Sequence, residues 1–455
     1  MHITTDYTVK NIAKIAALSV SSTLWASNAL AATHPVTQQH LVPPTLPELI
    51  HSALSNDATR YQFYAQSQAM RETGVAASTL MDPKLKMGFG GLPIDSFKFD
   101  EDPMTNVSVG LMQQFERGST LELQQKKANT QADGIAAQVQ NREIDVVNRI
   151  TQLWVELGYQ QSAQRILEQN KGLMREMERF IQTNYAIGKS EAQDLLNAQL
   201  QIAKLDEKLQ ANGQMQRRIV SQLSEWLGSE WIRSAQNIQA DNQLDWHKLE
   251  RIVEPNSVDH YRRLNQHPMV KMADINIAAN QTQVDIAEQA YTPQFGVEVM
   301  YAYRQANNMM GEPASDLVSA YLTMDIPLFT GNRQDRNLAA AQHQVGAAQS
   351  QKDSLLSQMN AQVNALLVDR ENLQQRLDRY TDMLLPQANA RIKAVERGYQ
   401  NNTAQFNDVI SATTDELALR VEQERLIADL NITNSNLAAL LGGFEYQVSQ
   451  PQLSK

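Results

Sequence analysis

Two carboxylates, Asp194 and Asp408, occupy matching positions in two similar stretches of the sequence. "NYAIGKSEAQDLLNAQ" begins at Asn184, "GYQNNTAQFNDVISAT" begins at Gly398, and the matching tyrosines, Tyr185 and Tyr399, are 214 positions apart. An aspartate just inside a helix start ordinarily complements the helix dipole. Its repetition in a second copy of the same stretch favours a shared function instead.

Other groups are not arranged for covalent or metal chemistry. The chain has no cysteine, and its eight histidines lack the H-x-x-x-H and H-E-x-x-H spacings of a catalytic zinc site. "GKS" at 188–190 is not a phosphate-binding loop, because Thr183 stands where the earlier glycine is required. No Ser/His/Asp or paired-carboxylate motif is recognisable. We therefore expect no enzyme, no cofactor and no metal site.

The similarity between the two stretches extends along the chain. Helix-closing prolines at 83 and 293, glycines at 118 and 331, and glycines at 228 and 442 recur at offsets of 210, 213 and 214. These offsets predict an internal duplication. The expected units are a first repeat (46–228), a linker (229–254), a second repeat (255–443) and a tail (444–455).

The N-terminus has the features of an export signal. Lys10 and Lys14 precede an apolar run from Ile15 to Trp25, and small residues at 29–31 suit cleavage. The sequence predicts a signal peptide over 1–31, followed by an extended segment over 32–45; a short buried helix is the alternative. No later segment has 18 uninterrupted apolar residues. The net charge of −10 argues against a nucleic-acid partner.

Each repeat contains two short alternating runs and two long helical patterns. The alternation predicts strands near 84–90, 105–114, 295–303 and 317–328, each with one apolar and one wet face. A heptad-like apolar pattern predicts a helix of about 65 residues from Asn332 to Tyr399, roughly 100 Å long. Each repeated stretch then forms the tip of a helical hairpin, near 185–190 and 399–404. Gly188 and Asn402 are expected at positive φ, with Ser190 and Thr403 as caps of the returning helices.

This arrangement resembles the TolC-like outer-membrane efflux family. The resemblance runs from about Leu46 to Gly443, and it is most specific at the two tips and at "IPLFTGN", 326–332. It implies an α+β, mainly α fold, in which three protomers share a twelve-stranded membrane barrel continued by a periplasmic helical tunnel. A closed barrel leaves no strand edge exposed to lipid. A soluble layer of hairpins is the alternative.

By resemblance, the tips close the tunnel and dock a periplasmic adaptor. The family's gate link falls on Asp194 and Tyr399, and Asp408 matches a constriction carboxylate whose threefold repetition would favour cations. Ala404 and Ser411 replace an arginine and a second aspartate of the family, which implies a weaker gate. The implied adaptor-docking positions are Ile187, Gly188, Lys189, Asn401, Asn402 and Thr403.

The expected function is a passive outer-membrane exit duct in a Gram-negative bacterium, largely periplasmic. Its expected partners are two further copies of itself, an adaptor (membrane fusion protein) and an inner-membrane pump of the resistance-nodulation-division type. Met81–Thr105 and the following "VGLMQQF" resemble the heavy-metal cation branch. Drugs or type I protein secretion are the alternatives within the class. A soluble periplasmic coiled-coil scaffold is the alternative outside it.

Overall fold

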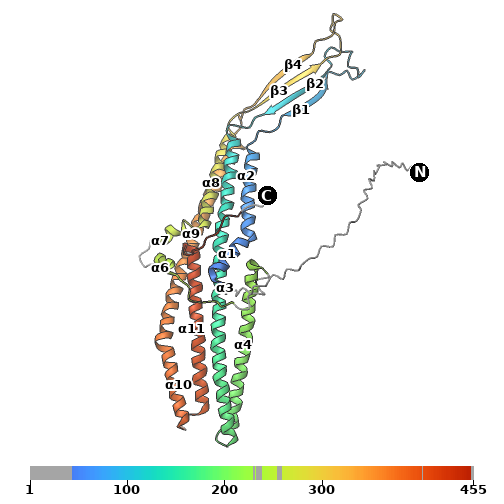
Figure 1. The fold of residues 1–455 in the computed structure, drawn as a ribbon. Coiled ribbons are helices and arrows are strands. Elements are labelled where there is room, and N and C mark those ends of the chain that lie inside the picture. Colours follow the sequence, from blue (N-terminus) through green and yellow to red (C-terminus); the bar gives the residue numbers. More distant parts are fainter. Residues whose placement is uncertain (1–43, 229–230, 232–237, 254–258, 402, 452–455) are drawn as a thin grey trace, which may run out of the picture. The chain divides into compact units, whose positions relative to one another are not determined.

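The computed structural model describes residues 44–228, 231, 238–253, 259–401 and 403–451. The predicted signal peptide, most of the extended segment 32–45 and part of the predicted linker lie outside these residues. The first half contains α1 (Leu46–Asn56), α2 (Ala58–Ala77), β1 (Lys84–Gly90), β2 (Asn106–Gln114), α3 (Thr120–Ala186) and α4 (Ala192–Leu227). The second half repeats this order from α8 onward (Figure 1). Its elements are α6 (His247–Val253), α7 (Asp259–Leu264), α8 (Pro268–Gln289), β3 (Gln294–Tyr303), β4 (Leu317–Asp325), α9 (Gln334–Arg379), η2 (Tyr380–Leu384), α10 (Leu385–Gln400) and α11 (Phe406–Leu441).

The four expected strands form one antiparallel sheet in the order β1-β2-β3-β4. The two halves of the chain meet at its centre, where Val109 of β2 pairs with Tyr301 of β3. The register places the alternating apolar residues of all four strands on the same face. β4 ends at Asp325, three residues before the predicted end, because Pro327 lacks the backbone N–H that the ladder requires.

One face of the sheet is apolar and uncovered by the described part of the chain. Its side chains are between 40 % and 74 % exposed for all members other than Ala320. They are Leu85, Met87, Phe89, Val107, Val109, Leu111, Phe295, Val297, Val299, Tyr301, Tyr303, Val318, Ala320, Leu322 and Met324. The opposite face carries glycines and charges, including an ion pair of 3.0 Å between Lys86 and Glu298.

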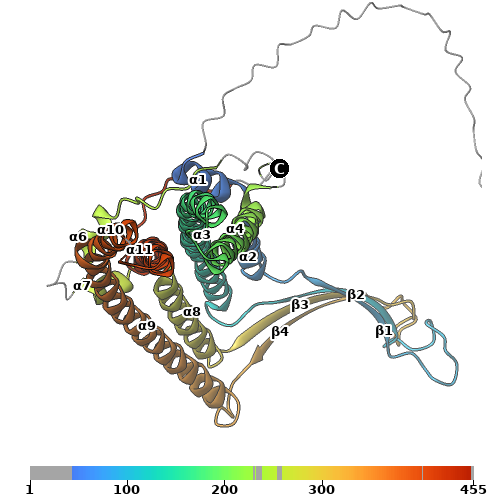
Figure 2. The same cartoon turned by 90° about the horizontal axis from the view of Figure 1, so that it is seen from below.

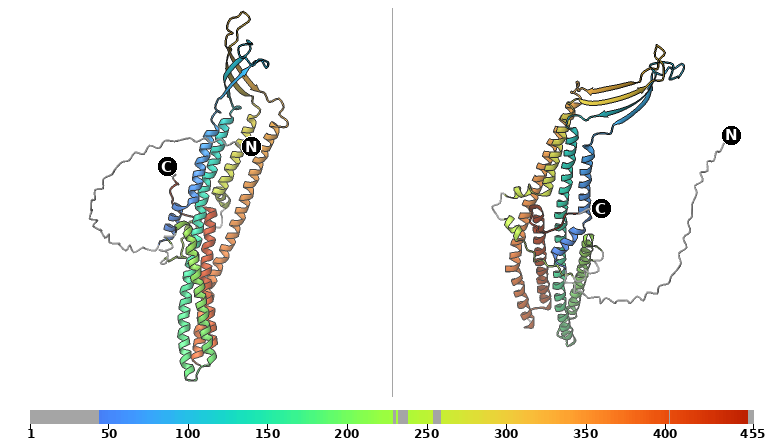
Figure 3. Two further views of the ribbon diagram at one scale, coloured as in Figure 1. Left: turned by 90° about the vertical axis from the view of Figure 1, so that its right-hand side faces the viewer. Right: turned by 45° about the horizontal axis from the view of Figure 1, so that its top comes forward.

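Helix α3 is the central rod of the helical part. Its 67 residues extend about 100 Å at ~1.5 Å per residue, as the sequence predicts for such helices. It packs against α2 and α8 in the portion next to the sheet, and against α4 and α11 toward the tips (Figures 2 and 3). Small apolar clusters lie along these contacts; the largest, around Ile150 and Trp154, joins α1, α3 and α4. This is the packing of long paired helices rather than of one globular core.

The predicted helix over Asn332–Tyr399 is interrupted. The turn Tyr380–Leu384 is a π-helix between α9 and α10, and Pro386 lies in the first turn of α10. Proline has no N–H to donate four residues back and its ring crowds that carbonyl, so the backbone widens locally. Among the described residues, no helix combines the length and the apolar character that crossing a membrane requires.

His267 provides a pH-dependent contribution to stability. It is buried at the start of α8, where its Nδ1 accepts a hydrogen bond of 3.2 Å from the Met269 N–H. Burial lowers the pKa of His267, although a backbone hydrogen bond at Ala439 acts in the opposite direction. In the unfolded chain His267 has its ordinary pKa of about 6.5, so the unfolded chain takes up a proton at a higher pH than the folded protein does. The free energy of unfolding therefore decreases as the pH falls from about 6.5 through the lowered pKa of the folded state.

We expect His267→Asn to flatten this part of the pH profile while retaining an oxygen that can cap the helix. The measurement is the midpoint of thermal unfolding, by circular dichroism, at pH 7.5 and 5.5. If the midpoint of thermal unfolding falls by the same amount from pH 7.5 to pH 5.5 in wild type and variant, His267 is not the responsible group.

Candidate channel gate at the helical tips

Both hairpin tips are tight turns closed by backbone hydrogen bonds. In the first tip, Gly188 has φ +74°, as predicted, and the Lys189 N–H donates to the Asn184 carbonyl over 2.8 Å. In the second, the Thr403 N–H donates to the Gly398 carbonyl over 2.8 Å. Asn402, the predicted counterpart of Gly188, lies outside the described residues.

The predicted caps of the returning helices are wrong. The N-cap position of α4 is Glu191, whose side chain makes no capping hydrogen bond, and that of α11 is Gln405; both have extended backbone. Thr403 is unavailable as a cap because its hydroxyl donates to the Gly398 carbonyl at 3.0 Å, within the turn. The turns are thus one or two residues longer than the sequence pattern suggested.

Tyr399 lies inside an apolar cluster that joins the two hairpins. Its ring makes edge contacts with Phe180 of α3 (6.4 Å between centroids) and Phe406 of α11 (5.9 Å). The same cluster contains the buried Ile181 and Ala198. Tyr399 therefore ties the end of α10 to both other helices, and its ring is half-buried.

Asp194 is half-buried in the first turn of α4, next to this cluster. Leu195 packs against the cluster that contains Tyr399, so the two predicted gate residues lie in the same layer of the tip. Within one protomer, however, no hydrogen bond joins the Tyr399 hydroxyl to the Asp194 carboxylate, and that carboxylate has no side-chain partner among the described residues. It is free to accept a donor from another chain.

Asp408 has a local partner. Its carboxylate accepts a hydrogen bond of 2.9 Å from the Gln405 N–H in a reciprocal capping box at the start of α11. The side chain is nevertheless exposed. Helix capping, the ordinary role of such an aspartate, is thus present, and it uses one of the two carboxylate oxygens.

The predicted docking residues lie on the surface of the tips. Ile187 is 61 % exposed, which is unusual for an isoleucine, and Gly188, Lys189, Asn401 and Thr403 are exposed beside it or on the second tip. Of the two positions that depart from the family, Ala404 is half-buried against the turn and Ser411 is exposed. The surface of the first tip therefore has an exposed apolar residue flanked by polar ones.

Two links between the helical hairpins were not predicted from the sequence. Near the tips, the Asn197 amide of α4 donates to Asn407 of α11 over 3.1 Å. Farther from the tips, Arg425 of α11 lies 2.7 Å from Glu156 of α3 and 4.6 Å above the Tyr159 ring. Isolated polar residues in a helical pattern give no signal of such pairing, because their partners lie more than 200 positions away.

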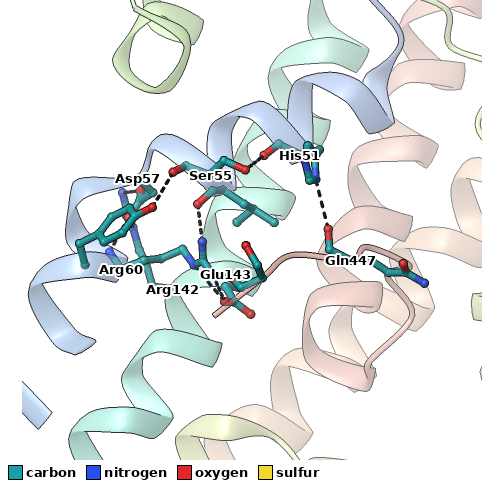
Figure 4. Close-up of polar contacts among 10 residues, drawn as sticks. His51, Ser55, Asp57, Arg60, Arg142, Glu143 and Gln447 are labelled. Carbon is teal, nitrogen blue, oxygen red and sulfur yellow. Dashed lines mark hydrogen bonds and ion pairs between the residues drawn. The ribbon is translucent and has the colours of Figure 1, made fainter. Parts of the chain in front are cut away.

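A buried arginine anchors the segment that follows α11. Arg60 is 1 % exposed; it lies 2.7 Å from Glu143 and donates to the carbonyls of Leu54 and of Ser449 (3.0 Å) (Figure 4). Beside it, Arg142 pairs with Asp57 at 2.7 Å. Burial, together with the Glu143 carboxylate, raises the pKa of the neighbouring Tyr446 to about 12. This network holds α1, α2, α3 and the C-terminal segment together at mid-length.

The comparisons with known proteins agree with this geometry. Residues 261–443, most of the second half, match the family model described as outer membrane efflux protein. Similar structures include the outer membrane protein VceC from Vibrio cholerae, at 15 % identity and a TM-score of 0.72, covering 87 % of this chain and 96 % of that one.

The structure of CusC, described in connection with transmembrane channel formation, is 16 % identical in sequence with a TM-score of 0.73. The match covers 88 % of this chain and 92 % of CusC. The outer membrane channel MtrE from Neisseria gonorrhoeae, in its open state, is 13 % identical with a TM-score of 0.66. The match covers 88 % of this chain and 89 % of MtrE. The chain has the fold of these outer-membrane channels. The mainly helical, duplicated fold class is thereby confirmed. No curated protein sequence matches the chain.

Proposed function

We propose that this protein is the outer-membrane exit duct of a tripartite efflux system, a passive conduit gated at its periplasmic helical tips. The observation that carries the proposal is the continuous apolar face of the sheet, exposed on all four strands. Water disfavours an apolar surface of that extent, whereas the hydrocarbon of a bilayer would cover it.

The edges of the sheet support a shared barrel. β1 and β4 each pair on one side only within the described chain. In lipid, unpaired backbone groups are very costly, so both edges need partners. Three copies would contribute twelve strands and close the sheet, with β4 of one protomer beside β1 of the next. Homotrimer formation is part of the proposal for this reason.

The other face of the sheet suits an aqueous lumen. It carries the Lys86–Glu298 ion pair and the glycines Gly88, Gly110 and Gly296, on strands whose opposite face is apolar. Glycines on one face allow a sheet to curve toward that face. The long helices then continue the barrel as a periplasmic tunnel that ends at the tips.

The proposed gate combines Asp194, Tyr399 and Asp408. Asp194 has an unpaired carboxylate, Tyr399 has a hydroxyl at the edge of the apolar cluster, and Asp408 has an exposed oxygen. In a threefold assembly the Asp194 carboxylate can accept a hydrogen bond across the protomer interface, and three Asp408 side chains form an acidic constriction. The exposed residues Ile187, Gly188, Lys189, Asn401 and Thr403, with Asn402, are the proposed contacts for a periplasmic adaptor, which connects the duct to an inner-membrane pump of the resistance-nodulation-division type.

We expect Tyr399→Phe and Asp194→Ala to enlarge single-channel conductance severalfold, because each removes one partner of a closing hydrogen bond. The measurement is current through purified protein in planar bilayers. Tyr185→Phe, at the matching position of the other tip and with an exposed side chain, is the matched control and should conduct as wild type does. If both gate variants have the conductance of wild type, the proposed conduit stands and the proposed gate is wrong.

Heavy-metal cations are the proposed cargo. Support comes from the resemblance of residues 81–105 to the metal-exporting branch and from the acidic constriction, which favours cations. If the acidic constriction favours cations, Asp408→Asn should lower the cation selectivity measured in the same bilayers. Drugs and secreted proteins are the alternative cargoes. If the protein fails to insert under conditions that admit a control channel, the soluble scaffold replaces the proposal.

A further inference from the structure

The helices toward the tips form a single row. Helix α10 packs against α11, α11 against α3, and α3 against α4, so α4 and α10 are the outer helices (Figure 2). Helix α9 and the π-turn η2, which lead into α10, also pack against α11. One edge of the row is thus α4, and the other is the continuous rod of α9, η2 and α10. Like the sheet, the row has two free edges within the described part of the chain.

A belt of polar contacts crosses this row. At one edge, the Thr381 hydroxyl of η2 accepts a hydrogen bond of 3.2 Å from α11. In the middle, Arg425 of α11 lies 2.7 Å from Glu156 of α3. Toward the other edge, the Gln160 carbonyl of α3 accepts a hydrogen bond of 2.9 Å from the Asn212 amide of α4. Glu156 and Gln160 are one helical turn apart, so this polar belt stays at nearly one height across the row.

Each end of the polar belt carries charges without a partner. On α4, Arg217 and Arg218 are exposed and form no ion pair with a described residue. On the opposite edge, Asp378 at the end of α9 and Asp382 in η2 are exposed and likewise have no cationic partner in the described part of the chain. Residues four positions apart lie on the same side of a helix, so both carboxylates face the same way. The two edges therefore have unpaired charges of opposite sign.

These opposite charges lie at the same height along the row. Helix α4 runs away from its tip, and Arg217 follows the belt residue Asn212 by five positions, roughly 7 Å at ~1.5 Å per residue. The rod on the other edge runs toward its tip, so Asp378, three positions before the belt residue Thr381, also lies farther from the tips, by roughly 5 Å. A neighbouring copy related by rotation alone would bring these charges face to face.

We propose that Arg217 and Arg218 of one copy of the chain pair with Asp378 and Asp382 of the next copy. Within one chain these residues lie at opposite edges of the row, so a second copy is needed to bring them together. The contact joins two different surfaces head to tail, and its repetition closes a ring when the rotation allows. Charged pairs beside a helix–helix contact set the choice and the orientation of the partner helix. The polar belt then continues from copy to copy around the tunnel.

The direction of this contact agrees with the edges of the sheet. Strand β4 leads directly into α9, and β1 follows α2, which packs on α3 on the same side as α4 (Figure 2). Pairing of β4 with β1 of the next copy therefore places α9 and η2 beside α4 of that copy. Exposed methionines, Met383 in η2 (52 %) and Met215 in α4 (37 %), supply apolar surface next to the charges. This contact between helices presupposes the proposed homotrimer.

The chain has no cysteine, so introduced cysteines report the contact directly. In Arg217→Cys/Asp378→Cys, oxidation of the purified full-length protein in detergent should join the copies, and non-reducing gels should show a covalent trimer. Arg217→Cys/Asp353→Cys is the matched control and should give no covalent trimer, because Asp353 is also an exposed carboxylate of α9 but lies roughly 37 Å farther along the helix. Since only this protein is present, a cross-link cannot come from an adaptor or another partner.

Charge reversal tests the ion pairs themselves. Arg217→Asp/Arg218→Asp and Asp378→Arg/Asp382→Arg should each lower the trimer fraction severalfold at a fixed protein concentration, because like charges then face each other. The measurement is analytical ultracentrifugation in detergent. The combination of all four substitutions brings opposite charges together again and should restore the trimer.

The outcomes separate this contact from the proposed duct. If wild type is trimeric but the cysteine pair does not cross-link, the assigned contact is wrong and the duct stands. The same holds if the trimer fraction is unchanged by the reversals or is not recovered by their combination. A wild type that remains monomeric contradicts the homotrimer and, with it, both proposals.

Discussion

Val109→Arg is expected to keep the protein out of the outer membrane. Val109 lies at the middle of β2 on the apolar face, between Met87 and Tyr301 on the neighbouring strands. An arginine facing lipid near the bilayer midplane costs about 2–4 kcal/mol, and a trimer would carry three copies, roughly 6–12 kcal/mol in total. The measurement is the fraction of protein recovered from outer-membrane preparations as a heat-modifiable trimer.

Ser108→Arg is the matched control. Ser108 is the adjacent residue, and its side chain points to the opposite face, where Oγ lies 3.4 Å from the Gly88 carbonyl. An arginine there joins Lys86 on the polar face and should leave insertion unchanged. If both variants insert equally well, the apolar face does not meet lipid, and the scaffold alternative becomes the better explanation of the sheet.

The strands and long helices could be predicted because their signals are local. Alternation with period two identified all four strands, and steps of three and four identified the helices. The pairing of β2 with β3 has no local signal, since α3, α4, α6, α7 and α8 all lie between Val109 and Tyr301 in the chain. The π-turn at Tyr380–Leu384 was missed although Pro386 was visible, because proline marks a disturbance without specifying how the backbone absorbs it.

The candidate site was predictable only in outline. Gly188 gave a positive φ as expected, because few other residue types tolerate it. The surroundings of Tyr399 were not predictable, since Phe180 and Phe406 come from two other helices and their meeting depends on how α3 and α11 pack. Tertiary packing, rather than residue type, determines these contacts.

Arg60→Met is expected to destabilise the folded protein strongly. The variant keeps most of the side-chain volume but removes the guanidinium that satisfies Glu143 and the carbonyls of Leu54 and Ser449. Removing one partner of a buried ion pair costs about 3–5 kcal/mol, because the other charge remains buried without compensation. The measurement is urea-induced unfolding followed by circular dichroism, with release of the segment after α11 followed by limited proteolysis near Ser449.

Arg71→Met supplies the comparison, since Arg71 also lies on α2 and pairs with an aspartate, Asp133, at 2.6 Å. Both side chains of that pair are exposed, 40 % and 58 %, so its loss should cost less than about 1 kcal/mol. The double variant Arg60→Met/Glu143→Gln separates the two causes. It should recover the part of the loss that comes from the uncompensated carboxylate and retain the part that comes from the unsatisfied carbonyls. Equal effects of Arg60→Met and Arg71→Met would mean that burial does not strengthen the Arg60 network, and that the C-terminal segment is held by its apolar contacts alone.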